Sequence, residues 1–271
     1  MSSRSVLISG CSTGIGRATA ARLARGGWTV YATARRPETL GELEAAGCRV
    51  LALDVTDEAS MRAAVDAVEG GVGVLINNAG YSQSGALEML PMYSVRRQFE
   101  TNVFGLLRMC QLVLPGMREA GEGKIVNVSS MGGRLTFPGG GAYHATKYAV
   151  EALSDALRME VGQFGIDVIC IEPGLIRTEF GETAASGVSE GDGPYAEFNA
   201  AVARSTREVY SGPLSRLGGD ADDVAAAIER ALGKRWAPAR VPVTPSARLI
   251  MGLRRVLPDR AWDRVIGSSF R

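Results

Sequence analysis

The sequence of 271 residues has few of the side chains that build zinc sites or disulfide scaffolds. It contains one histidine, His144, and four cysteines that are far apart in the chain and form no Cys-x-x-Cys pair. Because zinc sites combine several histidines or closely spaced cysteines, we expect no bound metal. The single histidine also excludes a relay of two imidazoles. The cysteine spacing predicts a reduced, cytoplasmic protein.

Long apolar runs and a strong charge of one sign are also missing. No stretch approaches the roughly 18 uninterrupted apolar residues of a membrane span, and the first residues lack the pattern of a secretory signal. The 30 Lys and Arg residues nearly balance 29 Asp and Glu residues, so charge gives no indication of nucleic-acid binding. In contrast, glycine is abundant: 34 residues predict many tight turns or close backbone approaches.

Short apolar runs alternate with longer segments of helical periodicity up to about residue 170. This alternation predicts an α/β fold, a single doubly wound Rossmann-like domain across residues 1–271 with a mostly parallel seven-stranded sheet and helices on both faces. Ligands of such sheets bind at the carboxyl ends of the strands. We predict strands at 6–8, 29–33, 50–53, 72–76, 124–128, 167–171 and 241–243, and helices at 15–25, 58–69, 95–120, 143–164 and 221–232.

The last third of the chain is less regular. Residues 181–194 are small, polar and rich in glycine, and we predict that they close over the substrate within a lid at 181–211. Residues 246–271 carry six arginines and two aspartates among apolar residues and form a C-terminal cap in this interpretation. The cap either closes over an apolar substrate or rests on an anionic membrane surface. Gly252 and Pro258 favour the first alternative, because they leave little continuous helix.

A glycine-rich turn joins the first strand to the first helix, with the spacing Gly10-x-x-x-Gly14-x-Gly16. Gly10 permits a sharp turn, Gly14 allows the backbone to approach a pyrophosphate, and Gly16 permits close packing of helix on strand. The helix N-terminus offers free N–H groups and a partial positive charge to phosphates. A glycine turn alone is weak evidence, but its position at the first strand–helix junction strengthens it. The predicted cofactor-binding residues of this turn are Gly10, Ser12, Thr13, Gly14, Ile15 and Gly16.

Further motifs follow the predicted strands in order. They are Asp54-Val55, Asn77-Asn78-Ala79-Gly80, Asn102, Ser130, Tyr143-x-x-x-Lys147 and Pro173-Gly174. With the glycine spacing, these motifs resemble the short-chain dehydrogenase/reductase family over about residues 5–180. The segment from Gly132 to Pro138 is similar to the steroid- and retinol-handling branch of that family, the 17β-hydroxysteroid and retinol dehydrogenase-like members.

The resemblance implies a nicotinamide cofactor and a catalytic group. In the family pattern, Tyr143 exchanges the proton, Lys147 bonds the nicotinamide ribose, Ser130 holds the substrate oxygen and Asn102 places a relay water. Helices 95–120 and 143–164 would pair the subunits of a homodimer or homotetramer, although core packing also explains their apolar faces. The cofactor-binding residues that the resemblance adds are Asp54 at the adenine amino group, Val55, Asn78, Ala79, Gly80, Tyr143, Lys147, Pro173, Gly174, Ile176 and Thr178.

The end of the second strand predicts NADP(H) rather than NAD(H). About 18 residues past Gly16, at the end of the second strand, NAD-binding folds normally carry an acid that bonds the ribose 2′-hydroxyl. Here the sequence is Thr33-Ala34-Arg35-Arg36, without an acid. Arg35 can pair bidentately with a 2′-phosphate, and Ala34 does not repel it. The alternative is an ordinary surface arginine pair ahead of a proline turn.

Tyr143 and Lys147 are one helical turn apart, so their side chains share a face. Tyrosine has a pKa of about 10, and bringing it near 7 requires about 4 kcal/mol of preferential stabilisation of the phenolate. The Lys147 ammonium supplies part of this, and an oxidised nicotinamide could supply more. Tyr-x-x-x-Lys occurs by chance in many helices, but Ser130, thirteen residues before Tyr143 at a strand end, argues against chance here.

These observations predict an NADP(H)-dependent oxidoreductase acting on a secondary alcohol or ketone, or an aldehyde, with a bulky apolar, steroid- or retinoid-like group. A regulator that senses NADP(H) without turnover is the alternative, and Ser130, Tyr143 and Lys147 argue against it. A dehydratase or epimerase of a longer family branch is disfavoured by the short C-terminal region. His144 points about 100° away from Tyr143 on a helix and is assigned a packing or interface role, as Cys11 is assigned a packing role.

Overall fold

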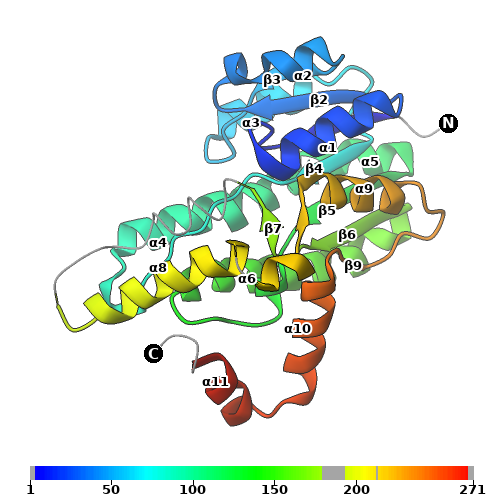
Figure 1. Cartoon of the computed structure of the whole chain (residues 1–271). Coiled ribbons are helices and arrows are strands. Elements are labelled where there is room, and N and C mark those ends of the chain that lie inside the picture. The colour runs from blue at the N-terminus through cyan, green and yellow to red at the C-terminus, as the bar shows by residue number, and fades with distance from the viewer. Residues whose placement is uncertain (1–3, 179–192, 212, 268–271) are drawn as a thin grey trace.

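The computed structural model describes residues 4–178, 193–211 and 213–267. Seven parallel strands form one sheet in the order β3-β2-β1-β4-β5-β6-β9 (Figure 1). The chain starts at β1, builds one side of the sheet with β2 and β3, and then builds the other side, which confirms the predicted doubly wound α/β fold. The strands are β1 (Ser5–Ile8), β2 (Thr29–Ala34), β3 (Arg49–Ala52), β4 (Val74–Asn77), β5 (Gly123–Val128), β6 (Ile166–Glu172) and β9 (Arg240–Pro242).

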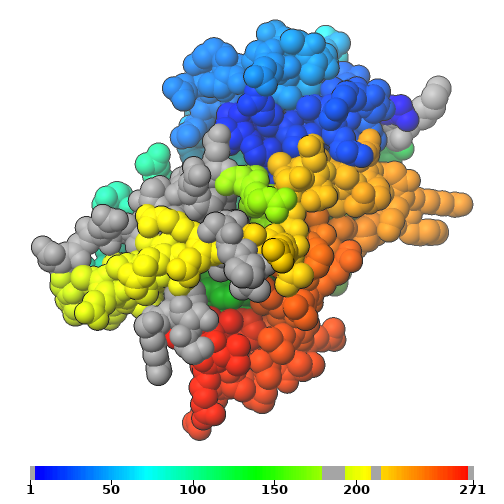
Figure 2. All heavy atoms as spheres, in the orientation of Figure 1, coloured from blue at the N-terminus to red at the C-terminus, as the bar shows by residue number. Residues whose placement is uncertain are grey.

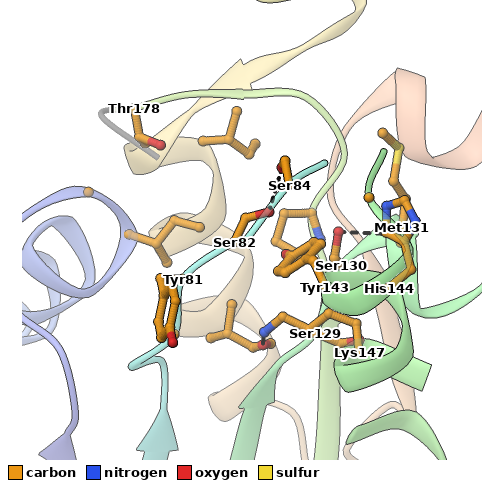
Figure 3. Close-up of a pocket in the computed structure, with 18 of the residues that line it drawn as sticks. Tyr81, Ser82, Ser84, Ser129, Ser130, Met131, Tyr143, His144, Lys147 and Thr178 are labelled. Carbon is orange, nitrogen blue, oxygen red and sulfur yellow. Dashed lines mark hydrogen bonds between the residues drawn. The ribbon is translucent and has the colours of Figure 1, made fainter. Parts of the chain in front are cut away.

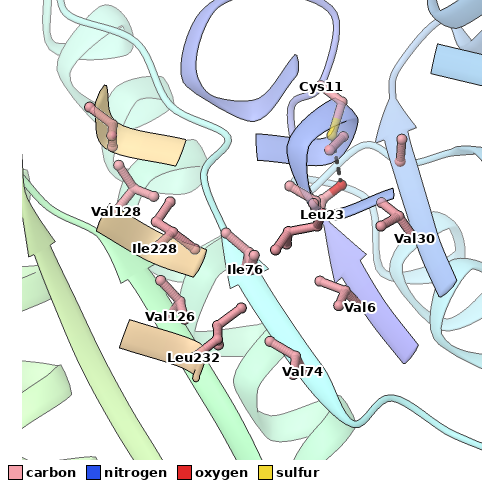
Figure 4. Close-up of a cluster of buried hydrophobic side chains, with 14 of the residues drawn as sticks. Val6, Cys11, Leu23, Val30, Val74, Ile76, Val126, Val128, Ile228 and Leu232 are labelled. Atoms are coloured by element: carbon pink, nitrogen blue, oxygen red, sulfur yellow. Dashed lines mark hydrogen bonds between the residues drawn. The ribbon is translucent and has the colours of Figure 1, made fainter. Parts of the chain in front are cut away.

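Both faces of the sheet are buried. Successive strand residues point to opposite sides, and residues on each side lie in a hydrophobic core. Val6 and Ile8 of β1 pack with Leu23 of helix α1 and Ile228 of helix α9 (Figure 4). Leu7, between them, packs on the other face with residues of α3, α5 and α6. This two-sided burial explains why the strands read as short apolar runs. The covering helices are α1 (Gly14–Arg25), α3 (Glu58–Asp66), α5 (Leu106–Ala120), α6 (Gly141–Val161) and α9 (Ala221–Leu232).

The predicted helix at 95–120 is longer and less regular than expected. Helix α4 (Met92–Phe99) continues through a π-helical segment, Glu100–Gly105, into α5. A π turn holds an extra residue, and such turns are frequent at functional sites. Gly105 is required here, because a Cβ at this position would collide with the carbonyl oxygen of Val55. The π segment thus brings this helix close to the loop that follows β3.

Several helices are not indicated by the sequence pattern. Helix α8 (Ala196–Ser211) occupies part of the predicted lid, whereas residues 179–192, which include most of the predicted closing loop, lie outside the described residues. No helix among the described residues is long and apolar enough to cross a membrane. The other elements not predicted are α2 (Gly41–Ala45), α10 (Pro245–Val256), α11 (Asp259–Gly267) and a small sheet of β7 (Ile176–Arg177) and β8 (Gly219–Asp220).

The C-terminal cap corrects the expectation for Gly252, which does not interrupt its helix, whereas Pro258 does separate two helices, as expected. Helix α10 runs through Gly252, whose Cβ position has no heavy atom within 4 Å, so glycine costs only its helix propensity of about 1 kcal/mol. The Thr244 side chain accepts a hydrogen bond from a first-turn N–H, and Pro245 occupies the first turn, where its missing N–H matters little. Pro258 lies between α10 and α11. The cap is therefore a pair of helices.

Candidate functional site

A cavity of about 1230 Å³ lies at the carboxyl ends of the strands. Its lining comes from the glycine turn, from the segments after β2 to β6, from the start of α6, and from α8, α10 and α11 (Figure 3). All of the site residues predicted from the sequence line this cavity except Gly16 and Asn102, which lie behind the lining. Residues predicted from seven separate segments of the chain therefore meet at one place.

The glycine turn has the geometry that phosphate binding requires. Gly10 and Gly14 adopt positive φ angles of 73° and 56°. A Cβ at Gly10 would lie 2.9 Å from the Cα of Ala79, and one at Gly16 would collide with the Gly10 carbonyl oxygen. Thr13 makes no side-chain capping bond to α1, so no side-chain cap competes with a ligand for the first N–H groups of this helix. This end of the cavity fits a phosphate group.

Asn78, predicted to bind the cofactor, holds the glycine turn in place. Its Nδ2 donates to the carbonyl oxygens of Ser9 and Gly10 at 3.0 and 2.9 Å. In return, the Ser9 hydroxyl accepts hydrogen bonds at 3.0 Å from the backbone N–H groups of Asn78 and Ala79. These four bonds tie the end of β4 to the turn after β1. The Asn78 side chain therefore acts as a support for the turn.

The side of the cavity next to β2 and β3 carries both signs of charge. Asp54 accepts hydrogen bonds from the backbone and hydroxyl of Thr56 at 2.9 and 2.7 Å. Burial opposes the ionisation of Asp54, but these bonds outweigh it, and with help from Arg35 and Arg97 they hold its pKa below the usual value. Arg97 comes from α4, and the sequence gives no signal for it. Arg35 and Arg97 therefore place positive charge at this end of the cavity.

Tyr143 and Lys147 project from the first turns of α6 into the same cavity, as their spacing predicts (Figure 3). The Lys147 Nζ lies 5.8 Å from the centre of the Tyr143 ring and donates a hydrogen bond of 2.8 Å to the carbonyl oxygen of Val128. Burial lowers the pKa of Lys147 to about 8, partly offset by the nearby Glu151 carboxylate. An ammonium group so placed lowers the free energy of a phenolate at Tyr143.

Ser130 follows β5 and faces the cavity beside this pair (Figure 3). Its hydroxyl oxygen accepts a hydrogen bond of 3.0 Å from the backbone N–H of Gly132. This bond occupies a lone pair and fixes the position of the hydroxyl, and the O–H remains a donor group. Ser130 can therefore donate a hydrogen bond to an oxygen atom of a ligand.

Asn102 lies in the π-helical segment and connects the cavity wall to α6. Its side chain bonds both backbone groups of Tyr81, accepting from the N–H at 3.1 Å and donating to the carbonyl oxygen at 2.9 Å. The same Nδ2 donates to the Thr146 hydroxyl at 3.1 Å. Asn102 thus fixes the loop after β4 next to Lys147, and its assignment as the holder of a relay water stays a prediction.

His144 also lines the cavity, although helix geometry turns it away from Tyr143. The two ring centres are 5.7 Å apart, and His144 Nδ1 accepts a hydrogen bond of 3.2 Å from the backbone N–H of Phe137. Burial lowers the pKa of His144 to about 4, so the ring is neutral at neutral pH. A Cβ at Gly132 or Gly140 would lie 2.6 Å from this ring. These contacts support a packing role, in which His144 positions the loop that carries Phe137.

A buried ionic cluster lies behind α6, the helix that carries Tyr143 and Lys147. Arg240 of β9 lies 2.9 Å from a carboxylate oxygen of Glu151 on α6 and 3.4 Å from one of Glu172 at the end of β6. Burial raises the pKa of Glu172 to about 7, and the Glu151 carboxylate adds to this effect, while Arg134 and Arg240 oppose it. Because Glu172 directly precedes Pro173, the cluster links α6 to the cavity loop after β6.

We expect Glu172→Gln to change how stability depends on pH. A carboxyl whose pKa is higher in the folded protein keeps its proton there, so its contribution to stability is present below about 4.5 and falls as the pH rises to about 7. The loss over this interval is about 3 kcal/mol at 1.36 kcal/mol per pKa unit. Urea unfolding across the interval should show wild type losing stability relative to the variant.

Glu160→Gln, at an exposed position of α6, is the control and should follow the wild-type pH dependence. A stability difference between Glu172→Gln and wild type that is the same at every pH would contradict the assigned pKa of Glu172.

The remaining part of the cavity is mainly apolar and comes largely from the predicted lid and cap segments, although the sequence did not identify the individual lining residues. The short turn after β5, the loop before α6 and the loop after β6 contribute part of the walls, and α8, α10 and α11 contribute the rest. The apolar side chains on these walls are Met131, Phe137, Leu175, Val202, Ile250, Leu253, Trp262 and Ile266. No group of three His, Cys, Asp or Glu side chains in the described part of the chain is placed to hold a metal ion.

Comparison with known proteins places this site in context. The sequence profile of the short chain dehydrogenase family matches residues 4–188. A 3-ketodihydrosphingosine reductase of Bacteroides thetaiotaomicron is 38% identical over 259 residues, covering 94% of this chain and 93% of that protein. An NADPH-dependent 3-dehydrocapnine reductase of Ornithobacterium rhinotracheale is 30% identical, with coverage of 99% and 98%. The Bos taurus retinol dehydrogenase 8 is 34% identical, with coverage of 88% and 80%.

Solved structures share the whole architecture. A short-chain dehydrogenase from Streptomyces avermitilis superposes with a TM-score of 0.80 at 37% identity, covering 96% of this chain and 97% of that one. A short chain dehydrogenase/reductase from Burkholderia phymatum, solved in complex with NAD, gives a TM-score of 0.78 at 26% identity, with coverage of 93% and 92%. Related proteins thus include both an NADPH-dependent enzyme and an NAD complex.

Proposed function

Because the chain belongs to the short-chain dehydrogenase family, we propose that it is an NADP(H)-dependent enzyme that interconverts a bulky apolar alcohol with its ketone or aldehyde. Members of this family are oxidoreductases that use nicotinamide cofactors. The observation that supports NADP(H) and a bulky apolar substrate is the cavity described above. It joins a phosphate-binding turn, the Ser130, Tyr143 and Lys147 group, and an apolar wall.

The residues of the cavity fit a nicotinamide dinucleotide. The N-terminus of α1, without a side-chain cap, suits the pyrophosphate, and the Asp54 carboxylate suits the adenine amino group. Arg35 and Arg97 provide positive charge for a 2′-phosphate, where an NAD-specific site would carry an acid. When bound, the cofactor supplies or accepts the hydride at its nicotinamide ring.

The side chains of the chain itself manage the proton and the substrate oxygen. Ser130 donates a hydrogen bond to that oxygen and orients the reacting carbon. Tyr143 gives its phenolic proton to the oxygen in reduction and takes it back in oxidation. Lys147, fixed by the Val128 carbonyl, keeps its charge close to the Tyr143 ring and stabilises the phenolate in between.

The substrate class follows from the apolar wall. An apolar group of the substrate is stabilised there by burial of about 25 cal/mol for each Å². Two relatives carry the names 3-ketodihydrosphingosine reductase and retinol dehydrogenase 8, and both named compounds place an oxygen-bearing carbon on a long apolar group. These names agree with the chemistry of the cavity and support a bulky apolar alcohol or carbonyl compound.

Ile250→Asn should weaken the use of bulky substrates selectively. Ile250 of α10 lines the apolar wall, and an amide there loses about 2 kcal/mol of apolar contact. We expect KM for a bulky apolar ketone to rise at least about tenfold, while KM for a small ketone stays within about twofold. Leu249→Asn, an exposed neighbour outside the cavity, is the matched control. An equal effect on both ketones would contradict this assignment.

The proposed activity can be tested with a panel of ketones and aldehydes, each with NADPH and with NADH, by following nucleotide oxidation. We expect turnover with NADPH that improves with the apolar size of the carbonyl compound. Tight NADPH binding without turnover of any member of the panel would instead indicate a nucleotide-sensing protein.

We also propose that the chain assembles as a homodimer or homotetramer through its long helices. Phe104, Tyr148 and Met159 expose large apolar surfaces along the π segment and α6. Such surfaces are typical of interfaces between subunits.

A further inference from the structure

The two C-terminal helices have two different faces. α10 leaves the end of β9 and extends away from the sheet, and α11 lies beyond it at the edge of the molecule (Figure 1). Ile250 and Leu253 of α10, with Trp262 and Ile266 of α11, line the apolar part of the cavity. The inner face of this helix pair therefore lines the cavity, whereas the outer face points away from it.

The outer face of α10 is apolar and exposed. Leu249 is 62% exposed and Val256 is 74% exposed, and the two lie seven residues apart, about two helical turns. Leu253, which is 41% exposed, lies between this face and the cavity that it lines. Val265 on α11 is 49% exposed. The orange and red surface of Figure 2 shows this region standing at the lower edge of the molecule. Single exposed apolar side chains are common on protein surfaces, but a cluster of them on one helix face is typical of a binding surface.

Arginines border this apolar stripe. Arg248 and Arg255 are exposed on the same side of α10, seven residues apart, and Arg260 and Arg264 are exposed on α11. Arg254 pairs with Asp259 at 2.6 Å, so that aspartate is already neutralised by a partner within the cap. Asp263 is the other acidic residue among the described residues of α10 and α11. The surface therefore has a positive charge with apolar side chains between the charges.

We propose that this outer face of α10 and α11 docks on an anionic phospholipid membrane. Leu249 and Val256 would enter the boundary of the acyl chains, while Arg248 and Arg255 reach the lipid phosphates. The charge of the face decides against a second copy of the chain, since the same arginines would oppose one another across a two-fold axis. An anionic lipid surface complements both the charge and the apolar stripe.

The location of this face also has a consequence for the substrate. The helices that bear it line the apolar end of the cavity, so a docked protein would hold that end next to the lipid. This part of the inference rests on the proposed function, whereas docking itself does not depend on catalysis.

Flotation with phospholipid vesicles tests the docking directly, without nucleotide or ketone. Wild type should float with vesicles of phosphatidylcholine and phosphatidylserine, much less with phosphatidylcholine alone, and less as the salt concentration rises. The double variants Arg255→Glu/Val256→Ser and Arg248→Glu/Leu249→Ser should each lose at least about tenfold in vesicle affinity. Both pairs lie outside the cavity, so reduction of a water-soluble ketone should be unchanged.

Arg235→Glu/Trp236→Ser is the matched control. Trp236 is 83% exposed beside Arg235, on the loop between α9 and β9, so this variant makes the same kind of change away from the proposed surface. It should bind vesicles like wild type. Circular dichroism should show equal helix content in all variants. Failure of wild type to bind anionic vesicles, or equal binding by the α10 variants, would overturn the proposal.

Sedimentation without vesicles separates docking from self-association. The α10 variants should sediment like wild type. A smaller assembly in those variants would show that the face joins copies of the chain and would overturn the assignment to lipid. If wild type binds anionic vesicles but reduces no ketone, the proposed function is wrong and the docking proposal stands. If it reduces ketones but does not bind vesicles, the docking proposal is wrong and the proposed function stands.

Discussion

Tyr143→Phe should lower kcat/KM for ketone reduction by about 10³-fold, since a positioned acid or base contributes roughly 10² to 10⁴. The substitution removes the phenolic hydroxyl and leaves the ring, its packing and its 5.7 Å contact with His144 in place. NADPH affinity, measured by fluorescence titration, should stay within a few-fold of wild type. The loss would then be assigned to proton transfer and not to binding.

Tyr148→Phe provides the control on the same helix. Tyr148 is exposed and outside the cavity, so the same loss of one hydroxyl should leave kcat/KM unchanged. Full turnover by Tyr143→Phe, or an equal decrease in both variants, would show that Tyr143 does not exchange the proton.

Ala34→Asp combined with Arg35→Ala should reverse the coenzyme preference. Both residues line the cavity after β2. Removal of the arginine loses a charge-assisted bond to a 2′-phosphate, about 2 to 3 kcal/mol, and the new carboxylate repels that phosphate while accepting a bond from a ribose hydroxyl. We expect the ratio of kcat/KM for NADPH to that for NADH to fall by at least about 10²-fold.

Arg36→Ala tests whether any arginine near this turn would have the same effect. Arg36 follows Arg35 directly but does not line the cavity, so the coenzyme ratio should change little. Arg97→Ala should weaken NADPH more than NADH, because Arg97 lies on the same side of the cavity as Arg35. A double variant that keeps the wild-type ratio would contradict the proposed NADP(H) preference.

Local sequence patterns were sufficient to predict the sheet and the polar half of the cavity. The strands alternate with helices, and the glycine turn, Asn78, Ser130, Tyr143 and Pro173 each follow a strand or begin a helix. Because the carboxyl ends of parallel strands meet at one edge, predicting the strands also places these residues together. The predicted helix at 221–232 has the observed bounds, since its apolar periodicity and capping residue Asp220 are local signals.

Composition indicated the lid and cap segments of the apolar half of the cavity, but the residues that line it depend on tertiary contacts that no local pattern reveals. Arg97 and Val202 reach the cavity from helices whose docking is set by tertiary packing. The π-helical segment arises where Gly105 packs against Val55, a contact between distant parts of the chain. In the cap, Gly252 does not end the helix as its residue type suggests, because it faces solvent on a helix that Thr244 caps.

The most direct test of the account is the transfer of deuterium from NADPH labelled at C4 of the nicotinamide to a bulky apolar ketone. Mass spectrometry of the product should find one deuterium on the carbinol carbon, from only one of the two labelled faces of the ring. An alcohol product without deuterium, or NADPH that binds the cavity and returns no labelled alcohol from any ketone of the panel, would contradict hydride transfer at this site.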